Sequence, residues 1–192
     1  MLADYFLARF AKARGVLMDT SEALLEKNGS DPRKTLLCWP AERMLERLEE
    51  GSFDVICMHS LLHHIVDGKY GSSGQLVREI LLQAARLLKP KGRLSLWEPV
   101  YDGWLIDTFP SRMIFRLTSS RIAAPICRLL GANTAGVGVR FQSSRQWRAT
   151  LKTCGFTVVH WDPAQNLRFN RLVKSCLLLQ EARSTHLWCA KE

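Results

Sequence analysis

The sequence predicts an α/β fold with a mostly parallel sheet and helices on both faces. Over the first hundred residues, short apolar runs typical of buried strands alternate with segments of helical periodicity. Turn residues such as Asn28-Gly29 and Gly51 separate these segments. Of the 192 residues, 47% are hydrophobic and 23% are charged, which is the composition of a globular chain and excludes a disordered or fibrous one.

Local patterns place the elements of the first half. Apolar residues recur at helical spacing in the first segment and predict a helix over 2–13. The apolar run after Gly15 ends at Asp19 and is typical of a buried strand, and Ser21 is placed to cap the next helix. That helix is expected at 22–27, followed by a strand at 35–38, a helix at 41–50, a strand at 53–58, a helix at about 75–88 and a strand at 93–98.

The pattern changes after the strand that ends at Glu98, where we expect a helical insertion at about 103–142. Within it, residues 110–131 predict one or two amphipathic helices broken near Pro125, and 131–142 predict a loop. The last expected elements are a helix at 144–154, a strand at 156–161 and two strand candidates at 172–179 and 185–190 that could form a final hairpin with an antiparallel last strand.

The net charge of +9 is concentrated in one segment. From Thr108 to Trp161 there is no Asp or Glu, while seven arginines and Lys152 contribute +8. Such a segment could attract an acidic or amphipathic substrate, bind nucleic acid, contact a membrane through the apolar run 113–117, or form a solvated arginine-rich face. Nucleic acid is disfavoured as a partner. On one helix Arg112 and Arg116 would share a face while Arg121 and Arg128 would lie roughly opposite, so the arginines would not line a single flat groove.

Other features exclude several classes of protein. Six cysteines without a C-x-x-C pair predict free thiols in a reducing cytoplasm and no metal site, rather than a disulfide framework or a zinc centre. Arginines interrupt the most apolar run, 113–130, so we expect no membrane span. The start of the chain has no apolar core of a secretory signal, although its basic and amphipathic character is compatible with a transit peptide.

Ligands bind at the carboxyl ends of the strands in open parallel sheets, so the residues that follow each apolar run are the candidates for a site. An acid at such a position, here Asp19, can accept hydrogen bonds from both hydroxyls of a ribose, or it can simply stabilise the start of the next helix. The other candidates lie at 38–42, at 59–64 and at Glu98.

Four segments in order resemble motifs of one family. Residues 15–25, 51–65, 87–99 and 151–159 are similar to the second, fourth, fifth and sixth strand regions of class I S-adenosylmethionine-dependent methyltransferases, in their small-molecule branch. Gly-Ser-Phe-Asp-Val at 51–55 with Lys-Pro-Lys-Gly-Arg at 89–93 is the most specific part. The resemblance implies a Rossmann-like fold, S-adenosylmethionine as cofactor, and methyl transfer to an O, N or C atom of a small molecule.

The resemblance also implies roles for individual residues. Asp19 would hold the cofactor's ribose, although this chain has Cys38-Trp39-Pro40 where the family usually has an acid or amide beside the adenine. The residues after the 53–58 strand would border the methyl group and the substrate. The implied cofactor-binding residues are Asp19, Thr20, Trp39, Glu42 and His59.

Histidines and an acid follow the strands on the substrate side. His63 and His64 could act as a general base near neutral pH, or they could be packing and capping residues. Glu98 could orient the substrate or be a structural acid at the strand end, and Arg112 and Arg116 of the insertion would bind the substrate.

The family's first motif, a strand followed by an acid and a glycine-rich turn, is not found in the sequence. Gly136-Val137-Gly138 is a poor substitute, because no strand precedes it and no helix follows it. We therefore expect a single methyltransferase-like domain over 1–192 that is N-terminally incomplete and has a substrate cover at 103–142. The alternative is a truncated or degenerate, non-catalytic module of the same fold; the oligomeric state is open.

Overall fold

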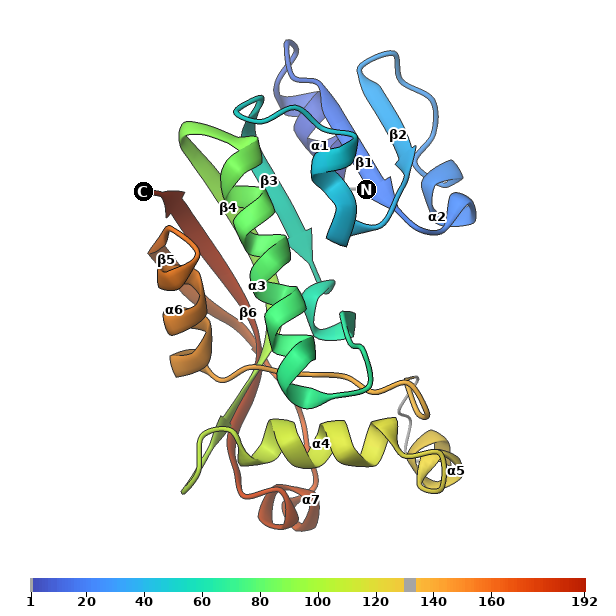
Figure 1. The fold of residues 1–192 in the computed structure, drawn as a ribbon, viewed down its shortest axis with the longest axis vertical. Coiled ribbons are helices and arrows are strands. Elements are labelled where there is room, and N and C mark those ends of the chain that lie inside the picture. Colours follow the sequence, from blue (N-terminus) through green and yellow to red (C-terminus); the bar gives the residue numbers. More distant parts are fainter. Residues whose placement is uncertain (1, 130–133) are drawn as a thin grey trace. The chain divides into compact units, whose positions relative to one another are not determined.

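The computed structural model describes residues 2–129 and 134–192, and the chain divides into two compact units, 1–48 and 49–192. Figure 1 labels the helices and strands of both. Each unit has its own sheet, with two strands in the N-terminal unit and four in the C-terminal unit. The prediction of a single domain stays a prediction.

The N-terminal unit is a parallel strand pair joined through a short helix. Its elements are α1 (Leu2–Arg9), β1 (Gly15–Asp19), α2 (Glu22–Glu26), β2 (Lys34–Cys38) and the 3-10 helix η1 (Ala41–Glu46). The strands pair in register from Gly15 opposite Lys34 to Asp19 opposite Cys38, so both end at the same edge. The element at 41–50 is shorter than predicted and is not an α-helix, because Arg43 has non-helical backbone angles.

The C-terminal unit is built on a four-stranded sheet in the order β3-β4-β6-β5. Strands β3 and β4 are parallel, whereas β6 lies antiparallel to both β4 and β5. The sheet is therefore parallel except for β6, which confirms the predicted α/β class and its antiparallel last strand. The strands are β3 (Phe53–His59), β4 (Leu88–Gly103), β5 (Phe156–Asn166) and β6 (Leu179–Lys191).

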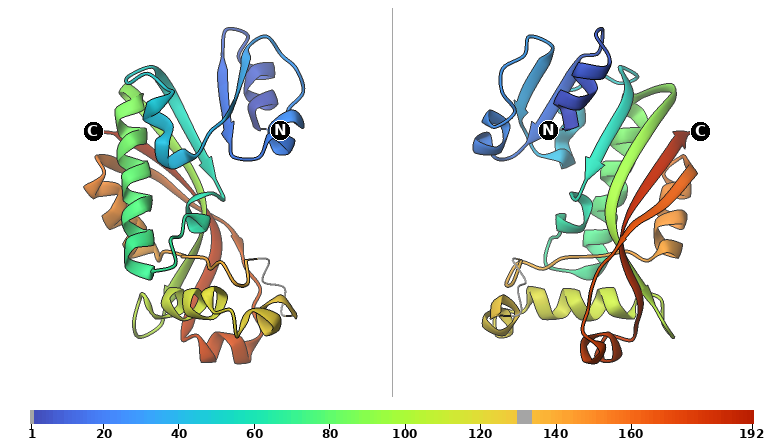
Figure 2. Two further views of the ribbon diagram at one scale, coloured as in Figure 1. Left: turned by 45° about the vertical axis from the view of Figure 1, so that its right-hand side comes forward. Right: turned by 180° about the vertical axis from the view of Figure 1, so that it is seen from behind.

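Helices α3 (Tyr70–Leu87) and α6 (Ser144–Thr153) lie against the same face of this sheet (Figure 2). Successive side chains of a strand point to opposite faces of the sheet, and on the face covered by the helices Leu94, Leu96 and Glu98 of β4 are fully buried. Side chains of α3 such as Ile80 and Leu81 are equally buried, and these apolar contacts form the core of the unit.

A second, smaller core forms where β4 and β6 extend as a two-stranded ribbon. The inserted helices α4 (Phe109–Ser119) and α5 (Ala124–Leu129) follow β4, while α7 (Arg171–Cys176) precedes β6. The Tyr101 and Phe141 rings stack with their centroids 4.1 Å apart, and burial raises the pKa of Tyr101 to about 12. The residues of this cluster are Tyr101, Leu177, Leu179, Ala182, Met113, Ile114, Phe141, Leu167 and Phe169.

This cluster uses most of the apolar run that was considered as a membrane contact. Met113 and Ile114 pack into it, and Phe115 is buried as well. Among the helices that the structure describes, none has the length and apolar character needed to cross a bilayer.

The predicted strand at 172–179 is wrong. Residues Arg171–Cys176 form α7, because the side chain of Asn170 accepts a hydrogen bond from the Leu172 N–H at 2.6 Å and so caps a helix. The tail contains one long strand, β6, in place of a hairpin. In the insertion, the helical break lies at 120–123, and residues 130–133 lie outside the described part of the chain.

Two adjacent leucines of α3 provide a matched test of the packing. Leu81 is fully buried, whereas Leu82 is 44% exposed. We expect Leu81→Ala to lower the free energy of unfolding by about 2–5 kcal/mol, since it opens a cavity in the core. Leu82→Ala should cost less than about 0.5 kcal/mol. Urea unfolding of both variants measures the difference, and equal costs would contradict the burial pattern.

Candidate functional site

The carboxyl ends of β1 and β2 bring several predicted cofactor residues together within the N-terminal unit. The Trp39 N–H donates a hydrogen bond to the Asp19 carbonyl at 3.1 Å, and the Cys38 thiol lies 3.6 Å from the Thr20 carbonyl oxygen. The Asp19 carboxylate accepts the Ser21 N–H through Oδ1 at 2.8 Å. Asp19 therefore orders the start of α2 with one oxygen, and its other oxygen has no hydrogen-bond partner among the described residues.

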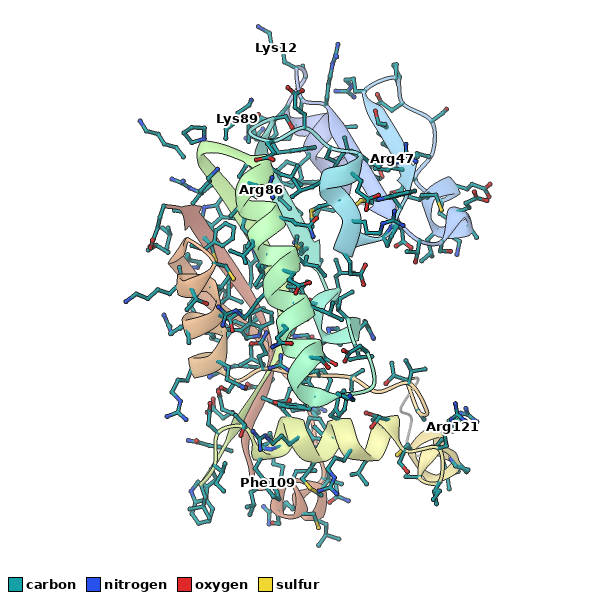
Figure 3. The ribbon with its side chains drawn as sticks, viewed as in Figure 1. Lys12, Arg47, Arg86, Lys89, Phe109 and Arg121 are labelled. Carbon is teal, nitrogen blue, oxygen red and sulfur yellow. The ribbon has the colours of Figure 1, made fainter. Side chains whose placement is uncertain are left out.

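Trp39 is held by the 3-10 helix that follows it. Its indole N–H donates to the Arg43 carbonyl at 2.9 Å, and the guanidinium groups of Arg43 and Arg47 lie 4.8 and 4.3 Å from the ring centroid. Figure 3 labels Arg47 in this region. Glu42 is exposed in the first turn of η1.

Glu98 accepts three hydrogen bonds inside the C-terminal unit. Its side chain is fully buried on β4, and Oε1 accepts hydrogen bonds from the backbone N–H groups of Leu61 and Leu62 at 2.8 and 2.7 Å. Oε2 lies 2.7 Å from Nδ1 of His63. A buried carboxylate is costly unless donors surround it, and these three donors fix the loop after β3 to β4, which continues past Glu98 to Gly103 and so does not end where predicted.

His63 lies in the short 3-10 helix η2 (Leu62–His64). Its contact with Glu98 determines which ring nitrogen is the hydrogen-bond donor. A carboxylate only accepts hydrogen bonds, so Nδ1 donates to Glu98, and Nε2 has no hydrogen-bond partner among the described residues. The ring stacks on Phe141 with the centroids 5.4 Å apart, and the tilted ring of His64 has its centroid 4.0 Å away. His63 is 9% exposed, so little of it contacts solvent.

His64 is more exposed than His63 and has no hydrogen bond to Glu98 among the described contacts. Partial desolvation lowers the pKa of His64, the neighbouring His63 lowers it further, and Glu98 opposes both effects. Of the two histidines, only His63 is fixed by a carboxylate.

His59 lies on the other face of the sheet. It pairs with Trp97, which precedes Glu98 on β4, so its side chain points away from the Glu98 face. The His59 ring is 3.2 Å from the Ser95 hydroxyl, which in turn lies 2.9 Å from Nε2 of His186. Desolvation lowers the pKa of His59 and of His186. The structure thus does not bring His59 into the His63–Glu98 cluster.

Arginines of the insertion lie near the start of α3. Arg112 is exposed, with its guanidinium carbon 5.5 Å from the centroid of the Tyr70 ring, and Arg116 is exposed one turn later on α4. Arg140 lies 4.8 Å from the same ring, and its backbone N–H donates to the His63 carbonyl at 2.9 Å. Sequence reasoning missed Arg140 and Phe141, because both lie in a predicted loop and only the run of uncompensated cations pointed to this region.

A polar pocket of about 400 Å³ lies at the far end of the β4–β6 ribbon. None of the predicted site residues lines it. Its charges pair with one another: Arg183 contacts Asp102 at 2.9 Å and Glu181 at 2.7 Å. This pocket is therefore separate from the cluster of His63 and Glu98.

Comparison with known proteins supports the resemblance seen in the sequence. Residues 1–94 match the family model described as a methyltransferase domain. None of the curated proteins matches the chain.

Solved structures share the fold at low sequence identity. An arsenic(III) S-adenosylmethionine methyltransferase from Chlamydomonas reinhardtii superposes with a TM-score of 0.62 at 15% identity, over 94% of this chain and 56% of that one. The mitomycin 7-O-methyltransferase MmcR gives 0.58 at 20% identity, over 100% and 45%. The [4+2]-cyclase SpnF gives 0.56 at 15% identity, over 98% and 69%.

The chain thus spans about half the length of the two methyltransferases. Its N-terminal half matches a methyltransferase family model, and nearly all of it aligns with structures of this fold. Residues 1–94 are similar to the methyltransferase domain family, and the chain as a whole shares the Rossmann-like fold of these solved structures.

Proposed function

We propose that this protein transfers a methyl group from S-adenosylmethionine to a small-molecule acceptor, with His63 as the general base. The observation that supports this most directly is the fully buried Glu98, which fixes His63 and the loop around it. A histidine with one nitrogen bound to a carboxylate and the other free is the arrangement that general-base catalysis needs.

The N-terminal unit fits the nucleoside part of the cofactor. Asp19 is partly exposed and has one carboxylate oxygen free of protein contacts among the described residues, so it can accept a ribose hydroxyl. Thr20 is exposed beside it, and Trp39 and Glu42 follow the neighbouring strand. We assign the ribose to Asp19 and Thr20 and the adenine to Trp39 and Glu42. In the C-terminal unit, His59 on the opposite sheet face from Glu98 is also assigned to the cofactor.

The chemistry that the cofactor supplies when bound is a sulfonium-activated methyl group, which needs no covalent help from the protein. The protein's own task is to position the acceptor and to remove its proton. Nε2 of His63 can accept that proton from a hydroxyl or an amine, and Glu98 then stabilises the positive ring.

Two other predicted residues take different roles in this proposal. Glu98 is buried and fully engaged by loop 61–63, so we assign it to positioning His63 in preference to contacting substrate. His64 lacks the carboxylate partner, and we assign it to packing beside His63. Arg112 and Arg116 remain candidates for substrate binding because both are exposed on α4.

We also propose the chemical class of the acceptor and the compartment in which the protein acts. The acceptor is a small molecule with acidic or amphipathic character, and nucleic acid is not the partner. All six cysteines are free thiols, which supports a reducing, cytoplasmic environment.

A non-catalytic module of the same fold is the second candidate. In the described residues β1 has β2 as its sole neighbour and β3 has β4 as its sole neighbour, so each leaves one strand edge unpaired. The glycine-rich turn that lets the backbone approach the methionine part of the cofactor is not found in residues 1–192. The similar fold of a [4+2]-cyclase also shows that this architecture is not restricted to methyl transfer.

Cofactor binding distinguishes the two candidates. We expect S-adenosylmethionine to bind the 192-residue chain in isothermal titration, and Asp19→Ala to weaken binding by roughly tenfold or more through loss of a charge-assisted hydrogen bond. Glu26→Ala, which removes an exposed acid of α2, is the control and should leave the affinity unchanged. Absence of binding by the unaltered chain would favour the non-catalytic module.

The assignment of the base predicts a difference between the two adjacent histidines. His63→Asn keeps an N–H toward Glu98 but removes Nε2, so kcat should fall by about 10²–10⁴-fold. His64→Asn should retain kcat within a few-fold. Formation of S-adenosylhomocysteine over a panel of small hydroxy and amino compounds measures both. Equal losses, or full activity of His63→Asn, would rule out His63 as the base.

The positioning role of Glu98 has a stability consequence. Glu98→Ala leaves two backbone N–H groups and the His63 ring without their buried acceptor, so unfolding should become easier by about 3 kcal/mol or more. Glu79→Ala on the exposed face of α3 is the control, with an expected change of less than about 0.5 kcal/mol. Urea unfolding compares them. A cost for Glu98→Ala no larger than the control's would show that the loop does not depend on this carboxylate.

A further inference from the structure

Two arginines share one tyrosine ring beside the His63 loop. The guanidinium carbons of Arg112 and Arg140 lie 5.5 and 4.8 Å from the centroid of Tyr70. Arg112 comes from the inserted helix α4, Arg140 from the segment that returns from the insertion, and Tyr70 from the first residue of α3. Three segments far apart in the sequence therefore place two positive charges against the same ring.

Neither arginine has a carboxylate partner among the ion pairs of the described residues. Arg140 donates through Nε to the Tyr70 carbonyl at 3.1 Å, while its Nη1 is buried and has no hydrogen-bond partner in that part of the chain. Desolvation lowers the pKa of Arg140, which is the effect expected of a guanidinium held away from water without an anion. A buried donor without an acceptor is rare in native structures, because it loses its hydrogen bonds to water.

The backbone of α3 makes room for this guanidinium. A Cβ atom on Gly74 would lie 2.8 Å from Nη2 and 2.9 Å from Cζ of Arg140, closer than such atoms approach. Gly71, one turn earlier, has open space at the same position. The lack of a Cβ at Gly74 thus leaves the space beside α3 that the Arg140 guanidinium occupies.

This arrangement is coupled directly to the proposed base. The Arg140 N–H donates to the carbonyl of His63, and the next residue, Phe141, stacks on the His63 ring. The Tyr70 hydroxyl donates to Ser111 at 3.0 Å, and Ser111 donates to the Phe141 carbonyl. Arg140 is therefore fixed relative to His63 by hydrogen bonds, and Arg112 is joined to the same network through its contact with the Tyr70 ring.

We propose that Arg140 and Arg112, held on Tyr70, bind an oxyanion group, a carboxylate or a phosphate, of the methyl acceptor. Guanidinium groups match both anions by paired N–H donors. This inference rests on the proposed methyl transfer, because it assigns an acidic group to the methyl acceptor and places that group beside His63. It also gives one part of the acid-free segment 108–161 a specific use, with Arg140 as a specificity-determining residue.

Binding of simple anions tests the site without any methyl transfer. Inorganic phosphate and acetate are titrated separately into the 192-residue chain at constant ionic strength, with the affinity and the shift in Tm as readouts. We expect one or both to bind, and Arg140→Gln and Arg112→Gln each to weaken that binding by roughly tenfold. Binding of phosphate alone assigns a phosphate-bearing acceptor, and binding of acetate alone assigns a carboxylic acid.

Two glycines give a matched pair that leaves every arginine in place. Gly74→Ala should displace the Arg140 guanidinium and weaken anion binding by about the same tenfold as Arg140→Gln. Gly71→Ala introduces the same residue into the same helix without a clash and should leave the affinity unchanged. Arg121 follows the C-terminal end of α4, whereas Phe109 is the first residue of that helix (Figure 3). Arg121→Gln is the control for a general loss of positive charge.

The possible outcomes separate this inference from the methyl-transfer proposal. Absence of binding of either anion, or equal weakening by Arg140→Gln and Arg121→Gln, would overturn the inference. Anion binding that depends on Arg140, in a protein that does not bind S-adenosylmethionine, would support the site and overturn the methyl transfer. If the enzyme methylates 4-hydroxybenzamide as well as 4-hydroxybenzoate, and Arg140→Gln changes neither rate, the methyl transfer holds and the acidic substrate class is wrong.

Discussion

The C-terminal unit depends on one buried carboxylate. Glu98 lies in the middle of β4 among fully buried apolar residues, where an unpaired charge would be strongly unfavourable. The strand tolerates it because loop 61–63 turns two backbone N–H groups and the His63 ring toward it. The same contacts determine where His63 lies and which of its nitrogens is protonated. The burial of Glu98 therefore determines the conformation of the loop that follows β3 and the ring nitrogen through which His63 donates.

The insertion is attached to this loop through its returning end. Phe141 stacks on both His63 and Tyr101, so it joins the loop to the small core formed by the β4–β6 ribbon and α4. Arg140 brings a charge to the same point, and Tyr70 links it to α3. The insertion predicted at 103–142 thus has a defined attachment to the loop that holds His63.

The fold alone does not decide the reaction, because structures with this architecture include methyltransferases and a [4+2]-cyclase. What favours proton removal and methyl transfer is the combination of local features. Asp19 in the N-terminal unit has acceptor capacity for a ribose, and His63 in the C-terminal unit has a fixed basic nitrogen. The unpaired edges of β1 and β3 favour the non-catalytic alternative, and cofactor binding is the property on which the two differ.

The sequence by itself determined the alternation of strands and helices, because hydrophobic periodicity and turn residues are local properties of the chain. It also placed Asp19 at the end of a strand and His63 in the segment that follows another, whereas Glu98, expected at a strand end, lies inside β4, which continues to Gly103. Only the tertiary structure decided that α7 replaces a predicted strand, that His59 and Glu98 lie on opposite faces, and that Arg140 meets Tyr70. These depend on capping, on strand register and on contacts between distant segments, which no local pattern contains.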